Sequence, residues 1–253
     1  MTLKEKLRRG VPTIGTWITL AHPALAEIAA RAGFDWVAVD LEHSSITIRE
    51  CEDLIRVLDL AGTTPLVRLT ANDPDLIKRV MDSGARGVIV PSVSTPEEAQ
   101  VAVEAVHYPP RGRRGVGLAR AHAYGADFAG YLKRLEREAV VVAMIENAQG
   151  VENAEHILAV PGIDAYLLGP YDMSASLGVA GKISHPKVEN AIASVRAAGK
   201  RARKPGGIHV IEPDPAALRR RLKEGFGFIA YSLETRVYDT ALRAALKGLR
   251  KPR

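Results

Sequence analysis

The sequence lacks the features that mark secreted, disulfide-linked or membrane-spanning proteins. Its single cysteine, Cys51, cannot form an intramolecular disulfide. No run of about 18 apolar residues is present, so we expect no membrane-spanning helix. The first residues, MTLKEKLRRG, contain no apolar stretch of the kind found in secretory signals. We therefore expect a soluble cytoplasmic protein that has no membrane partner.

Aromatic residues are also scarce, at 5% of the chain, and they do not alternate with basic residues. Lys and Arg total 35 against 29 Asp and Glu, which gives a net charge of +6. Part of the excess lies in residues 111–120 and 247–253. Nucleic-acid binding is therefore not expected. A moderate positive field is better suited to attracting small carboxylate substrates.

The hydrophobic residues, 47% of the chain, fall largely in short β-branched runs separated by segments with helical spacing. Eight such alternations predict an α/β protein whose residues 1–253 form one (β/α)₈ TIM barrel domain. An open, doubly wound sheet is the alternative, but no Gly-x-Gly-x-x-Gly motif follows the first run. The predicted strands are Ile14–Leu20, Trp36–Asp40, Leu66–Leu69, Val88–Val90, Val140–Ile145, Ala165–Leu168, Gly207–Val210 and Phe228–Tyr231.

Proline and glycine mark the predicted helix ends. Proline suits the first helical position because its missing N–H has no partner there, and glycine commonly closes helices. The predicted starts are His22-Pro23, Asp73-Pro74, Thr95-Pro96, His185-Pro186 and Asp214-Pro215, and the closing glycines are Gly33, Gly84, Gly199 and Gly225. Further helices are predicted at Gly150–Val160, Met173–Leu177 and Thr235–Leu249.

One long irregular segment, His107–Asp127, interrupts this alternation. It is rich in Gly and Arg and follows the fourth strand and its helix. We interpret it as an inserted loop of the barrel rather than as a linker between domains.

Charged residues follow the ends of four predicted strands. They are Asp40 at the end of the second strand with His43 three residues later, Arg68 at the end of the third, Glu146 after the fifth, and Asp172 just beyond the sixth. The C-terminal strand ends of a barrel form one face, so we expect these side chains to converge. Each residue alone could be a loop residue, a helix cap or half of an ion pair. Charges at four of eight strand ends are hard to explain by packing.

The residue types point to metal-assisted enolate chemistry. Glu146 and Asp172 offer only oxygen ligands, which Mg²⁺ and Mn²⁺ prefer, and would leave positions open for a 2-oxo acid. Arg68 would place positive charge where an enolate oxygen develops. His43, oriented by Asp40, would act as the general base near neutral pH. Together these groups predict an aldol or retro-aldol reaction through a pyruvate enolate.

The turn after the sixth strand completes the predicted site. It is formed by Gly169, Pro170, Tyr171 and Asp172 and opens a short predicted helix. Backbone N–H groups at a helix start favour anions, so we expect them to bind the substrate carboxylate.

These motifs resemble the HpcH/HpaI aldolase family, metal-dependent class II pyruvate aldolases of the 4-hydroxy-2-oxoheptanedioate and 2-dehydro-3-deoxyglucarate type. The resemblance covers nearly the whole chain and is specific in combination. The matching segments are Gly15–Trp17, Gly33–His43, Pro65–Arg68, Tyr108–Gly117, Ile145–Asn147 and Gly169–Gly178.

Several properties follow from the resemblance. It implies a (β/α)₈ barrel that forms a homohexamer, with the C-terminal helix exchanged between subunits. It implies a divalent ion (Mg²⁺, Mn²⁺ or Co²⁺) on Glu146 and Asp172, an Asp40–His43 base, and substrate contacts from Arg68, Trp17 and the turn after the sixth strand. Members cleave 4-hydroxy-2-oxo acids to pyruvate, or a close relative, and an aldehyde.

Two features depart from the family pattern. Met144 stands where some members have a glutamine that contacts the ligand. The segments His209–Glu212 and Tyr231–Glu234 are more polar and aromatic than we expect from the heptanedioate aldolases. The aldehyde half of the substrate is therefore left open.

Three other functions fit part of the sequence. A citrate-lyase-like or malyl-CoA-lyase-like enzyme of the same superfamily would need a surface for coenzyme A, which is not evident. A Schiff-base aldolase would need a lysine at a strand end, and Lys204 comes closest. A non-catalytic 2-oxo acid binding protein would keep the metal site without turnover.

Overall fold

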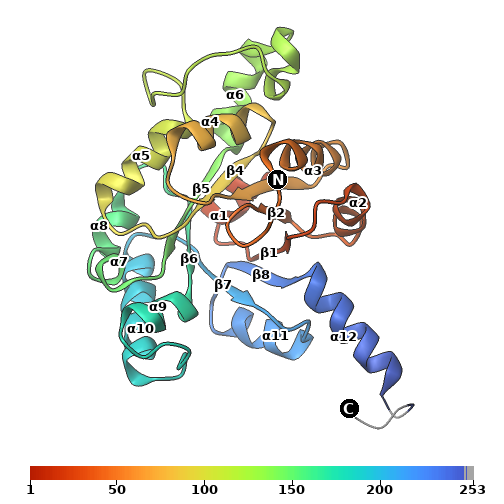
Figure 1. Cartoon of the computed structure of the whole chain (residues 1–253). Helices are drawn as coiled ribbons and strands as arrows, with labels where there is room; N and C mark the ends of the chain where they lie inside the picture. Colours follow the sequence, from red (N-terminus) through yellow and green to blue (C-terminus); the bar gives the residue numbers. More distant parts are fainter. Residues whose placement is uncertain (248, 250–253) are drawn as a thin grey trace.

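The computed structural model, which describes residues 1–247 and 249, is a closed barrel of eight parallel strands surrounded by helices (Figure 1). Each strand pairs with the next in sequence, and the last pairs with the first. The predicted TIM barrel is confirmed, and the open sheet is wrong. The strands are β1 (Thr13–Ile18), β2 (Trp36–Asp40), β3 (Thr64–Arg68), β4 (Gly87–Val90), β5 (Val140–Ile145), β6 (Ala165–Leu168), β7 (Gly206–Val210) and β8 (Phe228–Leu233).

Three predicted strands, those at β2, β5 and β6, match the observed bounds. Three strand ends differ from the prediction by two residues: β3 begins at Thr64 rather than Leu66, and β8 ends at Leu233 rather than Tyr231. β1 was predicted to continue to Leu20 and ends at Ile18. The strand stops there because the backbone N–H groups of Thr19 and Leu20 donate to Oε1 of Glu234, at 2.6 and 2.7 Å respectively. Hydrogen bonds to a neighbouring strand are replaced by bonds to one carboxylate.

The helices connect successive strands on the outside of the barrel (Figure 1). None of the helices in the described residues is long and apolar enough to span a membrane. They are α1 (Leu3–Arg8), α2 (Pro23–Arg31), α3 (Ile48–Leu60), α4 (Pro74–Asp82), α5 (Pro96–Val106), the 3₁₀ helix η1 (Arg120–Gly125), α6 (Phe128–Glu138), α7 (Ala148–Glu152), α8 (Ala154–Ala159), α9 (Pro170–Ser176), α10 (Pro186–Arg201), α11 (Pro215–Lys223) and α12 (Glu234–Leu246).

All five proline-marked helix starts are confirmed, each with a side-chain cap on the residue before the proline. Gly33, Gly84 and Gly225 follow helix ends with φ values of 86°, 104° and 88°, where glycine is favoured. The fourth glycine prediction is wrong, because Gly199 lies inside α10. A Cβ there would lie 2.3 Å from the Tyr166 ring, so close packing explains this glycine.

Three other helix predictions need corrected bounds. Gly150–Val160 is two short helices, α7 and α8, and the helix predicted at Met173 begins earlier, at Pro170. The last helix ends at Leu246, before the predicted Leu249, and residue 248 lies outside the described residues. The segment His107–Asp127 runs between α5 and α6 and contains η1.

Large side chains fill the inside of the barrel. The Trp36 and Phe228 rings stack with centroids 4.3 Å apart. Gly15 on β1 makes room for them, because a Cβ there would lie 2.0 Å from the Trp36 ring. A second apolar layer lies between the barrel and its helices. This packing sets the positions from which the strand ends project.

A buried ion pair lies near the N-terminal ends of the strands. The Lys4 side chain is only 1% exposed, and its Nζ lies 3.1 Å from Oδ2 of Asp164. The same ammonium donates a hydrogen bond to the carbonyl of Ala139, just before β5. Lys4 therefore ties α1 to the strands at this end.

We expect Lys4→Met to lower the free energy of unfolding by about 3 kcal/mol, because it leaves the Asp164 carboxylate buried without its cation. Urea denaturation followed by circular dichroism measures this change. The matched control is Lys200→Met, at an exposed position of α10. A loss for Lys4→Met no greater than that of the control would contradict the prediction.

Candidate active site

A cavity of about 690 Å³ opens at the C-terminal ends of the strands. Its wall includes Trp17 of β1, Arg68 of β3, Asp172 of α9 and His209 of β7. His43, which follows β2, also lines it. The structure therefore brings together predicted residues from separate strand ends, as the barrel geometry requires.

Glu146 and Asp172 follow the paired strands β5 and β6 and face the same small space. A Cβ added to Gly169 would lie 2.6 Å from Oε2 of Glu146 and 3.5 Å from Oδ2 of Asp172. Only glycine leaves this space free. The space between the two carboxylates suits a small cation with oxygen ligands.

Ser92 holds the buried Glu146 carboxylate in place. The Ser92 backbone N–H and hydroxyl both donate to Oε1 of Glu146, at 2.7 and 3.0 Å. Ser92 adopts a φ of 51°, in the left-handed region, a conformation that costs roughly 1 kcal/mol or more. Oε2 remains directed toward the space beside Gly169.

The carboxylates of this site disfavour one another's charge. Burial raises the pKa of Glu146, with the Ser92 hydrogen bonds opposing the shift and Asp172 adding to it. Burial also raises the pKa of Glu42 to about 7. The charge of Arg68 opposes this increase, and the carboxylates of Glu146, Asp40 and Asp172 add to it. A bound cation would offset this repulsion. Within the described residues, no group of three or more His, Cys, Asp or Glu side chains is placed to hold a metal ion. A cation held by Glu146 and Asp172 alone would keep coordination positions open for substrate and water.

Arg68 lines the cavity and is held rigidly there. Its Nε and Nη2 donate to the two oxygens of Asp40 at 2.8 and 2.5 Å. Its Cζ lies 4.4 Å from the centroid of the Trp17 ring, a cation–π contact. Nη1 lies 3.4 Å from Oε2 of Glu42. The guanidinium is therefore fixed by three neighbours.

The expected orientation of His43 by Asp40 is not what the structure shows. Asp40 accepts the backbone N–H of His43 at 3.3 Å, while its carboxylate oxygens are bonded to Arg68. The imidazole is 64% exposed, and its Nε2 lies 3.8 Å from Oε2 of Glu42. Arg68 displaces the imidazole because a guanidinium fork matches a carboxylate in two hydrogen bonds.

The turn after β6 needs one correction. Gly169 is the N-cap of α9, and the helix begins at Pro170. Proline has no N–H, so only Gly169, Tyr171 and Asp172 of the predicted turn have backbone donors. The Tyr171 side chain is 53% exposed at the mouth of the cavity.

Three residues at the site, Glu42, Ser92 and His209, were not predicted from the sequence. Glu42 lies two residues after Asp40, in a segment that was already singled out, and could have been included. Ser92 follows β4, which has no charged residue at its end. His209 was noted only as a departure from the family pattern.

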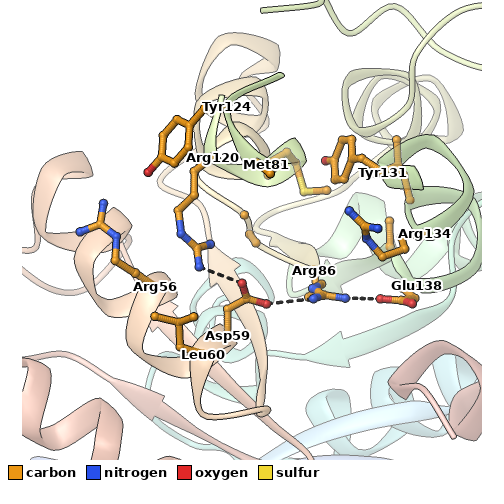
Figure 2. Close-up of a pocket in the computed structure, with 16 residues that line it drawn as sticks. Arg56, Asp59, Leu60, Met81, Arg86, Arg120, Tyr124, Tyr131, Arg134 and Glu138 are labelled. Carbon is orange, nitrogen blue, oxygen red and sulfur yellow. Dashed lines mark hydrogen bonds and ion pairs between the residues drawn. The ribbon is translucent and has the colours of Figure 1, made fainter. Parts of the chain in front are cut away.

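A second cavity, of about 460 Å³, lies near the N-terminal ends of β4 and β5. Figure 2 shows Arg120, Asp59, Arg86 and Glu138 joined by ion pairs along it. These arginines are paired with carboxylates from α3 and α6, so they tie η1 and the helices to the barrel. We assign this cavity a structural role.

The closed barrel, with two carboxylates and a fixed arginine at its C-terminal strand ends, has the architecture of a barrel enzyme. The chain belongs to the HpcH/HpaI aldolase/citrate lyase family, whose sequence model matches residues 13–241. The resemblance seen in the sequence is therefore confirmed.

Individual relatives point the same way. The chain is 37% identical over 246 residues to the hydroxypyruvate/pyruvate aldolase of Pseudomonas aeruginosa, covering 95% of this chain and 89% of that protein. It is also 37% identical over 249 residues to the 2-keto-3-deoxy-L-rhamnonate aldolase of Salmonella gallinarum, covering 96% and 91%. The crystal structure of an HpcH/HpaI aldolase/citrate lyase family protein from Burkholderia cenocepacia gives a TM-score of 0.92 at 38% identity, covering 98% and 99%. These relatives make the chain an enzyme of the aldolase type.

Proposed function

We propose that this protein is a divalent-metal-dependent aldolase that reversibly cleaves a 4-hydroxy-2-oxo acid to pyruvate, or a close 2-oxo acid, and an aldehyde. The observation that carries this proposal is the convergence of Glu146 and Asp172 beside Gly169. Gly169 and Asp172 line the same cavity as Arg68. The protein's aldolase relatives support a cleavage that releases an aldehyde over a citrate-lyase-like cleavage.

Glu146 and Asp172 would hold Mg²⁺, Mn²⁺ or Co²⁺, which when bound would supply a Lewis acid that polarises the substrate's keto group. Arg68, fixed by Asp40 and Trp17, stabilises negative charge on the developing enolate oxygen. The backbone N–H groups of Tyr171 and Asp172 bind the substrate carboxylate. His43 takes the proton from the C4 hydroxyl as the C3–C4 bond breaks, and its exposed position lets that proton exchange with solvent. A proton from solvent then adds to C3 of the enolate and gives the free 2-oxo acid.

A turnover screen tests this proposal. Purified protein is given 4-hydroxy-2-oxo acids with different aldehyde halves, with added Mg²⁺, Mn²⁺ or Co²⁺, and 2-oxo acid release is coupled to lactate dehydrogenase. We expect release that EDTA abolishes and added metal restores. Absence of release from every acid with every metal would overturn the proposal and leave the non-catalytic binding protein. Turnover unchanged by EDTA would exclude the metal-dependent reaction.

The structure argues against the Schiff-base alternative. Lys204 precedes β7, and its ammonium donates to the carbonyl of Ile163 at 2.5 Å, near the start of β6. It therefore lies at the opposite end of the barrel from the candidate active site. Borohydride with pyruvate should not trap a covalent adduct.

His43→Ala is expected to lower retro-aldol turnover by roughly 10²-fold, because a positioned general base contributes about that much. Pyruvate binding should change little, since Arg68 and the turn after β6 hold that half of the substrate. Steady-state kinetics and calorimetry with pyruvate measure the two effects. The control is His156→Ala, at an exposed position of α8. Equal turnover in the two variants would show that His43 is not the base.

We also propose that the protein is a homo-oligomer, a hexamer as the family resemblance implies. Figure 1 shows α12 extending away from the barrel. None of its described residues is buried, and Tyr238, Leu242 and Leu246, four residues apart, are exposed apolar side chains. Such a helix suits exchange between subunits, and light scattering on the purified protein measures the assembly. The cytoplasmic location expected from the sequence stays a prediction.

A further inference from the structure

The two oxygens of the Glu146 carboxylate have different surroundings. Oε1 accepts two hydrogen bonds from Ser92, one from its backbone N–H at 2.7 Å and one from its hydroxyl at 3.0 Å. A carboxylate oxygen has about two lone pairs for such bonds, so both lone pairs of Oε1 are already used. Oε2 accepts no hydrogen bond from the described residues and faces the space beside Gly169. Only Oε2 is therefore free to bind a cation.

The turn that carries Ser92 is fastened to the segment that carries Glu146. The Ser94 hydroxyl donates to the Ser92 carbonyl at 3.0 Å, and the side-chain amide of Asn147 donates to that hydroxyl at 2.8 Å. The side-chain amide of Asn153 donates to the Ser94 carbonyl, also at 2.8 Å. These bonds stabilise the turn in which Ser92 has a φ of 51° and its N–H points at Glu146. The two hydrogen bonds to Oε1 thus belong to a connected network.

Asp172, the second carboxylate, is less restrained. The residue is exposed, and its side chain accepts no hydrogen bond from the described residues. A Cβ added to Gly169 would lie 3.5 Å from Oδ2 of Asp172 and 2.6 Å from Oε2 of Glu146, so the two carboxylates flank one point. The protein therefore offers a cation one fixed oxygen from Glu146 and one or both oxygens of Asp172. Water and substrate must supply the other ligands.

This ligand set distinguishes two classes of cation. Mg²⁺ requires octahedral geometry at about 2.0–2.1 Å and is usually bound by one or two carboxylates together with water and substrate oxygens. Ca²⁺ binds about six to eight oxygens at roughly 2.3–2.6 Å and commonly takes both oxygens of one carboxylate. A glutamate that can offer only Oε2 suits Mg²⁺ and denies Ca²⁺ the second oxygen.

We propose that Ser92 is a positioning residue that sets the metal preference of this site. By occupying Oε1 it limits Glu146 to coordination through one oxygen, and so favours Mg²⁺ over Ca²⁺. The side chain of Ser92 supplies one of the two hydrogen bonds. Without the hydroxyl, a lone pair of Oε1 becomes available, and Glu146 can bind a larger cation through both oxygens. This inference rests on the proposed function, because it concerns the metal of that reaction.

Displacement of Mn²⁺ from the full-length protein tests this role without turnover. Electron paramagnetic resonance measures the free Mn²⁺ while Mg²⁺ or Ca²⁺ is added. Mg²⁺ should displace Mn²⁺ from the unaltered protein at lower concentrations than Ca²⁺ does. Ser92→Ala should reduce this preference for Mg²⁺ over Ca²⁺ by about 10-fold, the effect of one hydrogen bond to a charged group.

Two further variants separate the hydrogen bond from the turn. Ser92→Asn should retain most of the preference, because asparagine tolerates a positive φ and its side-chain N–H can replace the hydroxyl. Ser94→Ala should reduce the preference by less than Ser92→Ala does, because it loosens the turn but leaves both donors to Glu146 in place. Circular dichroism shows whether each variant keeps the fold.

The control is Ser194→Ala, at an exposed position of α10, which should leave the preference unaltered. Equal displacement by Mg²⁺ and Ca²⁺ from the unaltered protein, or a preference that Ser92→Ala does not change, would overturn the role of Ser92 while the aldolase proposal stands. A preference that Ser92→Ala reduces, without turnover of any 4-hydroxy-2-oxo acid, would support the role of Ser92 and overturn the aldolase proposal. Failure of Mn²⁺ to bind would overturn both.

Discussion

Glu146→Gln is expected to reduce metal-dependent turnover by roughly 10³-fold or more, because a Lewis acid contributes several kcal/mol of transition-state stabilisation. The substitution removes one of two carboxylate charges beside Gly169 and leaves an amide, a weaker ligand for a hard cation. The fold should survive, since an amide oxygen can still accept the two hydrogen bonds from Ser92. Asp172→Asn should behave in the same way.

Three measurements check this result. Steady-state kinetics gives turnover, calorimetry with Mg²⁺ gives metal affinity, and circular dichroism shows whether the fold is kept. Glu155→Gln is the matched control, because Glu155 is an exposed residue of α8 paired with Arg201. Near-normal turnover and metal affinity in either site variant would show that these carboxylates do not hold the metal.

Arg68→Lys is expected to lower kcat by roughly 10²-fold or more, the range seen when one transition-state donor is removed. Lysine keeps the charge but loses the planar fork. Arg68 uses Nε and Nη2 to hold Asp40, so its charge is fixed in the cavity wall. A single ammonium group cannot reproduce both bonds and the contact with Trp17. The charge would therefore be less well placed toward an enolate oxygen.

Kinetics must be separated from stability for this variant, because buried Asp40 loses part of its pairing. Urea denaturation gives the stability, and turnover is measured well below the unfolding transition. Arg49→Lys, on the exposed side of α3, is the control. If Arg68→Lys changes only KM, then Arg68 binds the ground state and does not stabilise the enolate.

The barrel itself could be predicted from the sequence because its signals are local. Short β-branched runs, a capping residue before proline and a glycine after a helix each depend on a few neighbouring residues. Trp36–Asp40 and Val140–Ile145 were predicted with the observed bounds for this reason. The metal-site hypothesis followed from the same pattern, since successive strand ends must share one face. The structure places Glu146 and Asp172 together there, and their role remains the proposal made above.

Side-chain pairing at the site was decided by tertiary structure. Asp40 lies three residues from His43, yet its carboxylate pairs with Arg68, on the neighbouring strand. Ser92 reaches Glu146 from the end of β4, and His209 meets Trp17 across separate strands. Nearness in sequence says little about the direction of a side chain after a strand ends. Direction is set by which buried charges and hydrogen-bonding groups the closed barrel brings within reach of one another.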